Sequence, residues 1–399
     1  MLKKKILLIA PSSIPTFGAE AIVNKKLIFT LVKSEKFEID LISQRIKWKH
    51  YPVEEQDIPL KSIHIIDNDL RVTPIMIWQH ILAFFKFGIT FKAIHWAVKA
   101  LPIAEKLVKQ NKYDYILTKD APSFVIGNYL KHKYGIKWIA TWNDPYPGVK
   151  YPCPYGKGWS ASGNVFDKMC TSAMEGADKY IFPSERLRNH MLKYLNIRLE
   201  DTVIIPHVVL DTDNNNVQQG KVLKLLHSGT LQSPRDPETF LRALKLFLLN
   251  NPDSNIEVSI LGIIEEKGAK LIKQLKLEDV VKLIPPVSYT QSLEILKDYQ
   301  IALIVEAQCN EGIFLPTKVT DFMQCHKPIF AVSPSVGVLN DMYNNGFVQY
   351  FADVTDIDSI ANTLENIYSD FSNDKLTNVV LRPNSEFSEK QIIEQYYNL

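Results

Sequence analysis

The chain has 399 residues, more than the roughly 250–300 over which one hydrophobic core keeps growing, so two domains are expected. A hydrophobic content of 46% with 23% charged residues excludes extensive disorder. The net charge of +2 conceals an asymmetry, because residues 1–200 hold 30 Lys and Arg against 18 Asp and Glu, whereas residues 201–399 hold 16 against 26. The first half is therefore expected to meet an anionic surface, such as phospholipid headgroups, a lipid pyrophosphate or an acidic glycan.

The first half alternates buried strands with helices. The apolar run 5–10 is too short for a secretory signal and predicts a first buried strand, and a helix is expected over 19–34. Further strands are predicted at 37–43, 113–118, 137–141 and 179–183. This alternation indicates βαβ units around a parallel sheet, which binds ligands at the carboxyl ends of its strands.

Residues 74–101 carry apolar side chains at helical spacing, among them Trp78, Ile81 and Phe85. Lysines at 86, 92 and 99 argue against a membrane-spanning helix. Two interpretations stay open. One is an interfacial helix that rests in lipid headgroups, and the other is a pair of ordinary core helices, which show the same pattern.

The second half repeats the strand and helix alternation. Strands are predicted at 223–229, 256–262, 281–284, 301–305 and 328–332, with helices at 237–249 and 291–297. The polar stretch 211–220 predicts a linker, and Ser388 is expected to cap a final helix. We expect two Rossmann-like domains, at 1–205 and 206–383, with a helical segment 384–399 that packs back on the first.

Several common signatures are absent from the sequence. It has no GxGxxG after a strand, no GxxxxGK[ST], no GxSxG and no HExxH, which disfavours dehydrogenases, P-loop ATPases, α/β-hydrolases and zincins. Its four cysteines lack CxxC spacing, so neither zinc nor a redox pair is expected, and a reducing cytoplasm fits. No zinc finger, RNP motif or basic-aromatic run supports a nucleic-acid partner.

Three loops at strand ends carry groups that suit a nucleotide. Gly18 lies where the backbone can approach a ligand before a helix N-terminus, although an ordinary strand-to-helix turn explains it equally. Arg235 offers a fixed cation to a diphosphate leaving group, the alternative being a surface arginine. Lys318 and Asp321, at the start of a helix, suit phosphate and ribose hydroxyls respectively.

In this order the segments resemble the retaining family-four glycosyltransferases of GT-B fold. The segments that carry the resemblance are Phe17-Gly-Ala-Glu20, 118–124, 138–146, 177–184, 203–211, 229–238 and 316–328. The resemblance implies an α/β fold in which two Rossmann-like parallel-sheet domains face each other across a cleft and a C-terminal helix crosses back to the first domain.

The resemblance also implies that the first domain binds the acceptor and the second binds the nucleotide sugar, and it implies roles for particular residues. The donor-binding set is Gly18, Gly229, Thr230, Arg235, Pro316, Thr317, Lys318 and Asp321. Phe17, Glu20, Asn143 and Asp144 form the acceptor-binding set, and Arg235, Lys318 and Asp144 are the candidate catalytic residues. An Asx turn before Pro145 explains Asn143 and Asp144 equally well.

The chain departs from the family pattern at four positions. Thr230 replaces a common arginine, Phe17 a glycine and His207 a usual asparagine. Ile313 stands where the first glutamate of the family's Glu-x7-Glu motif would fall, which removes the usual contact to the donor sugar. Glu306 and Glu311 are candidates to replace it, although the type and position of each favour a solvated loop carboxylate.

The expected function is transfer of a sugar, with retention, from a UDP or GDP donor to a glycan or polyprenyl-linked acceptor in surface polysaccharide biosynthesis. No metal and no further cofactor are expected. The enzyme is expected in the cytoplasm, peripheral on the inner face of the membrane. Two other classes stay open: a sugar-nucleotide epimerase of the same fold, and a non-catalytic binding or assembly protein, to which the missing glutamate lends weight.

Overall fold

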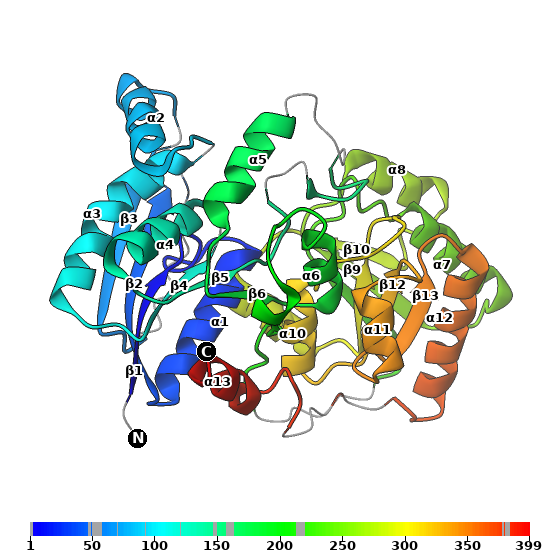
Figure 1. Ribbon diagram of the computed structural model, residues 1–399. Helices are drawn as coiled ribbons and strands as arrows, with labels where there is room; N and C mark the ends of the chain where they lie inside the picture. The colour runs from blue at the N-terminus through cyan, green and yellow to red at the C-terminus, as the bar shows by residue number, and fades with distance from the viewer. Residues whose placement is uncertain are drawn as a thin grey trace. The chain divides into compact units, whose positions relative to one another are not determined.

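The computed structural model describes two compact units of the chain (Figure 1). Unit 1 comprises residues 1–210 with 383–399, and unit 2 comprises residues 211–382. Within them the described residues are 3–46, 49, 58–69, 71–91, 93–119, 121–146, 150–156, 163–212, 220–376, 379 and 384–399, of which 163–168 are described by their backbone alone. The linker predicted at 211–220 falls largely outside the described residues.

Unit 1 is built on a seven-stranded parallel sheet. Its strand order is β3 (Ser62–Asn68), β2 (Phe37–Ile46), β1 (Lys4–Ile9), β4 (Tyr115–Lys119), β5 (Trp138–Thr141), β6 (Lys179–Phe182) and β7 (Thr202–Ile204). The helices are α1 (Ala19–Lys33), α2 (Pro74–Phe87), α3 (Ile94–Gln110), α4 (Ala121–Tyr134), α5 (Gly163–Met174), α6 (Glu185–Met191) and α13 (Glu389–Tyr397). The strand order reverses beside β1, which has β2 on one side and β4 on the other.

Unit 2 repeats the plan with six parallel strands. They run in the order β10 (Val281–Ile284), β9 (Ile256–Leu261), β8 (Leu223–Ser228), β11 (Ile301–Val305), β12 (Ile329–Ser333) and β13 (Tyr350–Asp353). Its helices are α7 (Glu238–Asn250), α8 (Glu266–Gln274), α9 (Tyr289–Lys297), α10 (Thr317–Gln324), α11 (Val338–Asn344) and α12 (Ile357–Ser372). Here the order reverses beside β8, which lies between β9 and β11.

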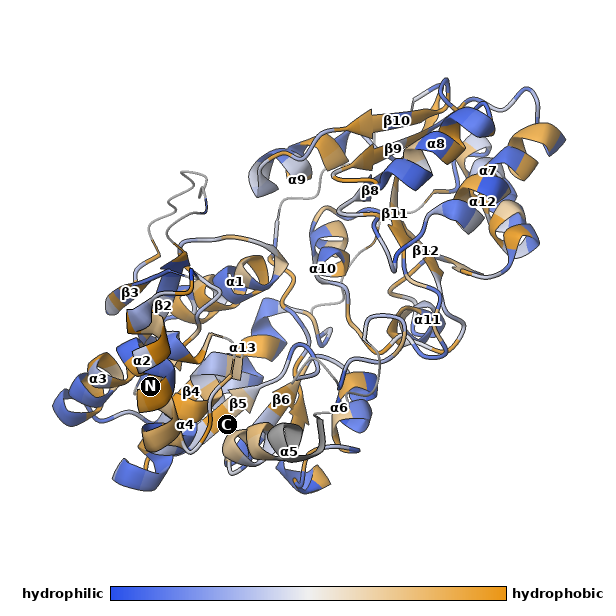
Figure 2. Cartoon of the chain, turned by 90° about the horizontal axis from the view of Figure 1, so that it is seen from above, coloured by the Kyte–Doolittle hydropathy of each residue, from blue (hydrophilic) through white to orange (hydrophobic). Residues whose placement is uncertain are grey.

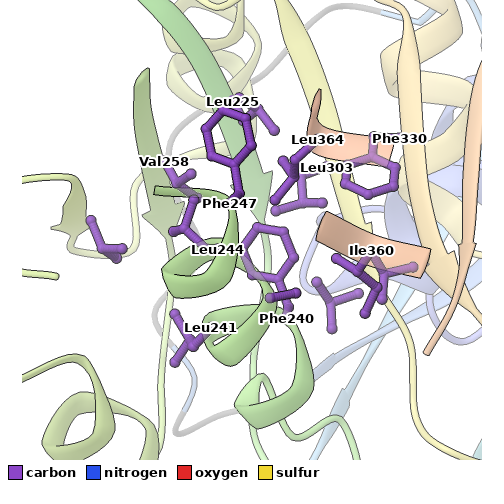
Figure 3. Close-up of a cluster of buried hydrophobic side chains, with 14 of the residues drawn as sticks. Leu225, Phe240, Leu241, Leu244, Phe247, Val258, Leu303, Phe330, Ile360 and Leu364 are labelled. Atoms are coloured by element: carbon purple, nitrogen blue, oxygen red, sulfur yellow. The ribbon is translucent and has the colours of Figure 1, made fainter. Parts of the chain in front are cut away.

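Each sheet has a continuous apolar core. In unit 2, aromatic and aliphatic side chains of α7 and α12 pack on β8, β9 and β11 (Figure 3). Phe240, Leu244 and Phe247 from α7 meet Ile360 and Leu364 from α12 in this layer. Because parallel strands are covered on both faces, they carry unbroken apolar runs, which is why their positions could be predicted. The predicted pair of Rossmann-like parallel-sheet domains is confirmed.

Helix α13 belongs to unit 1 although it follows unit 2 in the sequence. The Ser388 hydroxyl caps its first turn by accepting a hydrogen bond from the Gln391 N–H, as predicted. Ile392 and Tyr396 are buried in the core of unit 1 beside β1 and β4. The Tyr115 hydroxyl of β4 donates to the Tyr396 carbonyl oxygen at 2.9 Å, which ties the helix to the sheet.

Residues 74–101 form two helices that differ from each other. Helix α3 is a core helix, with Trp96, Ala97 and Leu101 fully buried. Helix α2 buries only Ala83, although most of its residues are apolar; Figure 2 colours these residues orange and the polar ones blue. The interpretation as a pair of core helices therefore holds for α3 and is wrong for α2. Within the described part of the chain, no helix has the length and apolar character needed to cross a bilayer.

Candidate functional site

The candidate site in unit 2 begins at the carboxyl ends of β8 and β11, which are neighbours at the point where the strand order reverses. Arg235, in the loop after β8, donates a hydrogen bond from Nε to Oε2 of Glu306 at 3.0 Å. Glu306 directly follows β11 and its side chain is only 9% exposed, whereas that of Arg235 is 36% exposed. The buried carboxylate therefore fixes the guanidinium at a strand end, where open α/β sheets bind ligands.

Lys318, on the first turn of α10, joins this pair. A Cβ added to Gly229 would lie 2.9 Å from Lys318 Nζ, so the amine rests against the backbone that leaves β8. Burial lowers the pKa of Lys318 to about 8, with Arg235 adding to that effect and Glu306 and Asp321 opposing it. Two cations and one buried carboxylate thus converge beside a glycine turn, where the side chains of Arg235 and Lys318 suit an anionic ligand.

The turn after β8 depends on two glycines. Gly229 and Gly262 have φ of 135° and 137°, a region that side chains other than glycine rarely adopt. A Cβ on Gly262 would lie 2.2 Å from the Gly229 carbonyl oxygen, so the ends of β8 and β9 meet backbone to backbone. This close approach fixes the backbone of Gly229 beside Lys318.

Asp321 lies one helical turn beyond Lys318 on α10. Its Oδ1 accepts a hydrogen bond of 2.7 Å from the hydroxyl of Tyr289, the first residue of α9. The carboxylate is therefore held in one orientation beside the cation pair. It influences the pKa of Lys318, which shows that the two side chains share one electrostatic environment.

The remaining predicted donor residues of unit 2 border the same loops. Thr230 is exposed directly after Gly229, and Pro316 and Thr317 begin α10, where the Thr317 carbonyl accepts a hydrogen bond from the Thr320 hydroxyl.

Ile313, in the position of the missing glutamate, is 1% exposed and packs into the interior. Glu311 is half-buried. Glu306 is not the solvated loop carboxylate that its residue type favoured, because it is buried and paired with Arg235.

In unit 1 the turn after β1 is open. Gly18 caps α1 with φ of 85°, and a Cβ added there would meet nothing within 4 Å. The neighbouring Phe17 ring is 45% exposed, and the Lys49 ammonium lies 3.7 Å from its centroid, a cation–π contact. A free helix N-terminus with space in front of it offers backbone N–H groups to a ligand.

Glu20 and Asn143 are brought together although they lie far apart in the sequence. Asn143 Nδ2 donates to Glu20 Oε1 at 2.6 Å, and Asn24 Nδ2 donates to the same oxygen at 3.1 Å. Asp144 is exposed next to this pair. The loops after β1 and β5 therefore join three of the four predicted acceptor residues into one polar surface of unit 1.

Sequence reasoning missed some buried polar groups. Lys26 and Lys119 are 5% and 2% exposed in unit 1, near His207. Burial lowers the pKa of His207 to about 3, and the positive charges of these two lysines add to the effect.

In unit 2, neither Tyr289 nor the pairing of Glu306 with Arg235 was predicted, because contacts across 32 and 71 residues leave no local pattern. The position of Glu306 at the end of a strand was the one available signal. Among the described residues, no group of His, Cys, Asp and Glu forms a metal site.

The chain matches two protein families in sequence. Residues 62–212 match Glycosyltransferase Family 4, and residues 211–378 match Glycosyl transferases group 1. No curated protein has a sequence that matches this chain. The two family matches adjoin and together run from residue 62 to residue 378.

Solved structures with the same fold cover almost the whole chain. Sucrose-phosphate synthase from Thermosynechococcus elongatus has a TM-score of 0.67 at 14% identity, over 99% of this chain and 98% of that one. HepE from Anabaena, in complex with UDP and glucose, gives the same TM-score, identity and coverage. A glycosyltransferase from Rickettsia africae has a TM-score of 0.67 at 15% identity, over 99% and 97%. At these identities the likeness establishes the fold.

Fold and family matches together define the class: the chain is a glycosyltransferase of GT-B fold, and it is an enzyme. Within that class, the match of residues 62–212 to Glycosyltransferase Family 4 supports the resemblance that the segments of the chain carry.

Proposed function

We propose that this enzyme transfers a sugar from a UDP or GDP donor to a glycan or polyprenyl-linked acceptor, with retention of anomeric configuration, in surface polysaccharide biosynthesis. The observation that carries the donor assignment is the Arg235–Glu306–Lys318 cluster at the strand-order reversal of unit 2. The UDP complex of the similar HepE structure adds support for a nucleotide-sugar donor.

In this proposal the bond between the anomeric carbon and the diphosphate oxygen breaks, and its electron pair leaves with the nucleoside diphosphate. Arg235 and Lys318 stabilise the charge that grows on the phosphate, which is worth most where the cations are held in place before the reaction. Glu306 holds Arg235 in position, and Asp321, oriented by Tyr289, faces the ribose hydroxyls. These groups supply charge stabilisation without a metal.

The acceptor oxygen then bonds to the anomeric carbon on the face that the diphosphate left, and its proton passes to the departing phosphate or to Asp144. In this scheme the Glu20–Asn143 pair of unit 1 orients the acceptor hydroxyl. Gly18 brings the backbone N–H groups of α1 to a phosphate. The positive charge balance of residues 1–200 favours a polyprenyl pyrophosphate as acceptor and a position on the inner face of the cytoplasmic membrane.

Donor binding is tested by thermal shift of the full chain with UDP-, GDP- and CMP-linked sugars. At a ligand concentration of about 100 Kd the folded state gains about 2.7 kcal/mol, which raises the melting temperature by several degrees. Lys318→Met removes one of the two cations and is expected to lower the shift by about half, because a tenfold weaker affinity leaves about 1.4 kcal/mol of this gain. Its control is Lys273→Met, which removes an exposed lysine from the last turn of α8. Equal shifts in the two variants would overturn the donor site.

The donor that stabilises the protein then separates transfer from epimerisation. Incubated without acceptor, a transferase leaves this donor almost unchanged, whereas an epimerase converts it to an isomer that NMR detects. With acceptor present, the coupling constant of the anomeric proton in the product reports retention or inversion. Formation of an isomer without acceptor would refute the transfer assignment, and an inverted product would refute retention alone.

A further inference from the structure

Helix α2 of unit 1 presents an apolar surface to solvent. Six of its fourteen residues are large apolar side chains that are at least 42% exposed, namely Ile75, Ile77, Trp78, Ile81, Phe84 and Phe85. Phe85 reaches 80% exposure and Ile75 reaches 70%. Single exposed apolar residues are ordinary, but a contiguous set of this kind on one element marks an interaction site.

The helix is well formed despite this exposure. The Thr73 hydroxyl caps it by accepting from the Met76 N–H, and Gly88 ends it in the left-handed conformation with φ of 71°. His80 ties α2 to the segment that follows, because its Nδ1 lies 2.6 Å from the Thr90 hydroxyl and its ring stacks on His95 of α3 at 5.8 Å. The apolar surface therefore belongs to a helix that is capped at both ends and held against the segment that follows it.

The segment that contains α2 is basic. Residues 70–104 hold Arg71, Lys86, Lys92 and Lys99 and no Asp or Glu, although Arg71 is paired with Asp69 at 2.5 Å. Lys86 is exposed on the last turn of α2. Beside that turn lies a cavity of about 370 Å3, lined by Lys86, Phe87, His132 and Lys133 among others. The apolar surface thus ends at a basic margin.

We propose that α2 docks unit 1 on the surface of a bilayer that contains anionic lipids, with its apolar side chains among the acyl chains and its lysines at the headgroups. Fourteen residues of helix span about 21 Å, short of the ~30 Å of a hydrocarbon core, so the helix lies in the interface. Aromatic side chains and flanking lysines are the groups that favour this position.

A second copy of the chain is the competing partner, and the charge argues against it. In a two-fold dimer the same patch meets itself, so the exposed Lys86 of both copies would enter one interface to which α2 contributes no carboxylate. An anionic leaflet supplies the missing negative charge. This inference deepens the membrane position proposed above. The docking surface involves none of the donor residues, so vesicle binding and sugar transfer can fail or succeed separately.

The test measures sedimentation of the full chain with phosphatidylcholine vesicles, with and without phosphatidylglycerol. The wild type is expected to bind the anionic vesicles at least tenfold more tightly. Phe85→Ser removes one exposed ring and should weaken this binding by on the order of tenfold. Lys86→Gln removes one charge near the lipid surface and should weaken it about fivefold.

Matched controls lie in unit 2. Leu249→Ser removes a side chain that is 66% exposed at the end of α7, and Lys273→Gln removes an exposed lysine from the last turn of α8. Both should bind vesicles within twofold of wild type, and all four variants should keep the wild-type melting temperature and nucleotide affinity. Equal vesicle binding by Phe85→Ser and wild type would overturn the proposal. So would a concentration-dependent dimer, seen in lipid-free sedimentation velocity, that Phe85→Ser abolishes.

Discussion

The two units share a strand, a glycine turn and a helix at the point where their strand order reverses, yet the side chains around the two turns differ. In unit 1 the space in front of Gly18 is open. In unit 2 the Lys318 amine and the end of β9 crowd Gly229, and Arg235 is clamped by a buried carboxylate. The comparison shows that one backbone plan can present either free N–H groups or fixed side-chain charge.

This difference matches the tasks we propose for the two units. Breaking a glycosyl–phosphate bond needs charge that is in place before the reaction. A half-buried arginine held by a buried carboxylate, together with a half-buried lysine, provides it. Binding an acceptor needs room and hydrogen-bonding groups, which the open turn and the Glu20–Asn143 pair provide. Three sets of measurements, on Arg235, on the glycines of the two turns and on Lys318, test this contrast.

The largest effect is expected for Arg235→Ala. Removal of a fixed cation that stabilises the leaving group should lower turnover by about 100-fold or more, measured as nucleoside diphosphate released from the stabilising donor. Arg242→Ala is the control, since Arg242 is an exposed arginine of α7 that pairs with Glu238 at i, i+4, and its turnover should stay near wild type.

Arg235→Ala also leaves the buried Glu306 without its arginine. The double variant Arg235→Ala/Glu306→Gln removes this carboxylate charge, so it should recover thermal stability while turnover stays low. Near-normal turnover in either variant would contradict the role of Arg235.

An intermediate effect is expected on stability from the glycines. Gly262→Ala places a methyl group against the Gly229 carbonyl and should destabilise the protein by about 3 kcal/mol through strain and overpacking. Gly18→Ala meets no atom within 4 Å and should cost about 1 kcal/mol, from its positive φ alone. Calorimetric unfolding of the two variants measures the difference. Equal losses would show that the turn in unit 1 is as crowded as the turn in unit 2.

The smallest effect is a pH dependence of donor affinity. With its pKa at about 8, the Lys318 amine is charged at pH 7 and largely neutral at pH 9. A bound diphosphate raises that pKa, so binding above pH 8 requires uptake of a proton and weakens by at most about tenfold between pH 7 and pH 9. Titration calorimetry with UDP at several pH values measures this slope. Lys318→Met should bind more weakly and flatten the profile, and an unchanged slope in that variant would assign it to another group.

The sequence predicted the fold better than the site. Strands such as β1, β4 and β11 are buried over most or all of their length and carry apolar runs, so they were found within one or two residues. The edge strand β3 was missed because polar residues, among them His64 and Asp67, break its apolar run, and β13 is short and half-buried. Helical periodicity alone did not distinguish the buried α3 from the exposed α2.

At the site, residue types and strand ends were enough to select Arg235, Lys318 and Asp321, which the structure gathers around one glycine turn. Their roles toward a donor stay predictions. The partners that orient them, Glu306 and Tyr289, come from distant segments, and only the folded sheet brings these together. In the same way, Glu20 was selected from a local turn, but its hydrogen bond to Asn143 required the structure.

Helix α13 has a consequence for biogenesis. Its residues Ile392 and Tyr396 fill part of the core of unit 1, yet a ribosome makes them only after the whole of unit 2. Until that helix arrives, the nascent first unit exposes an apolar gap beside β1 and β4. Unit 2 is continuous in the sequence and has no such delay, so it is free to mature first, against the usual order in which N-terminal domains fold first during translation.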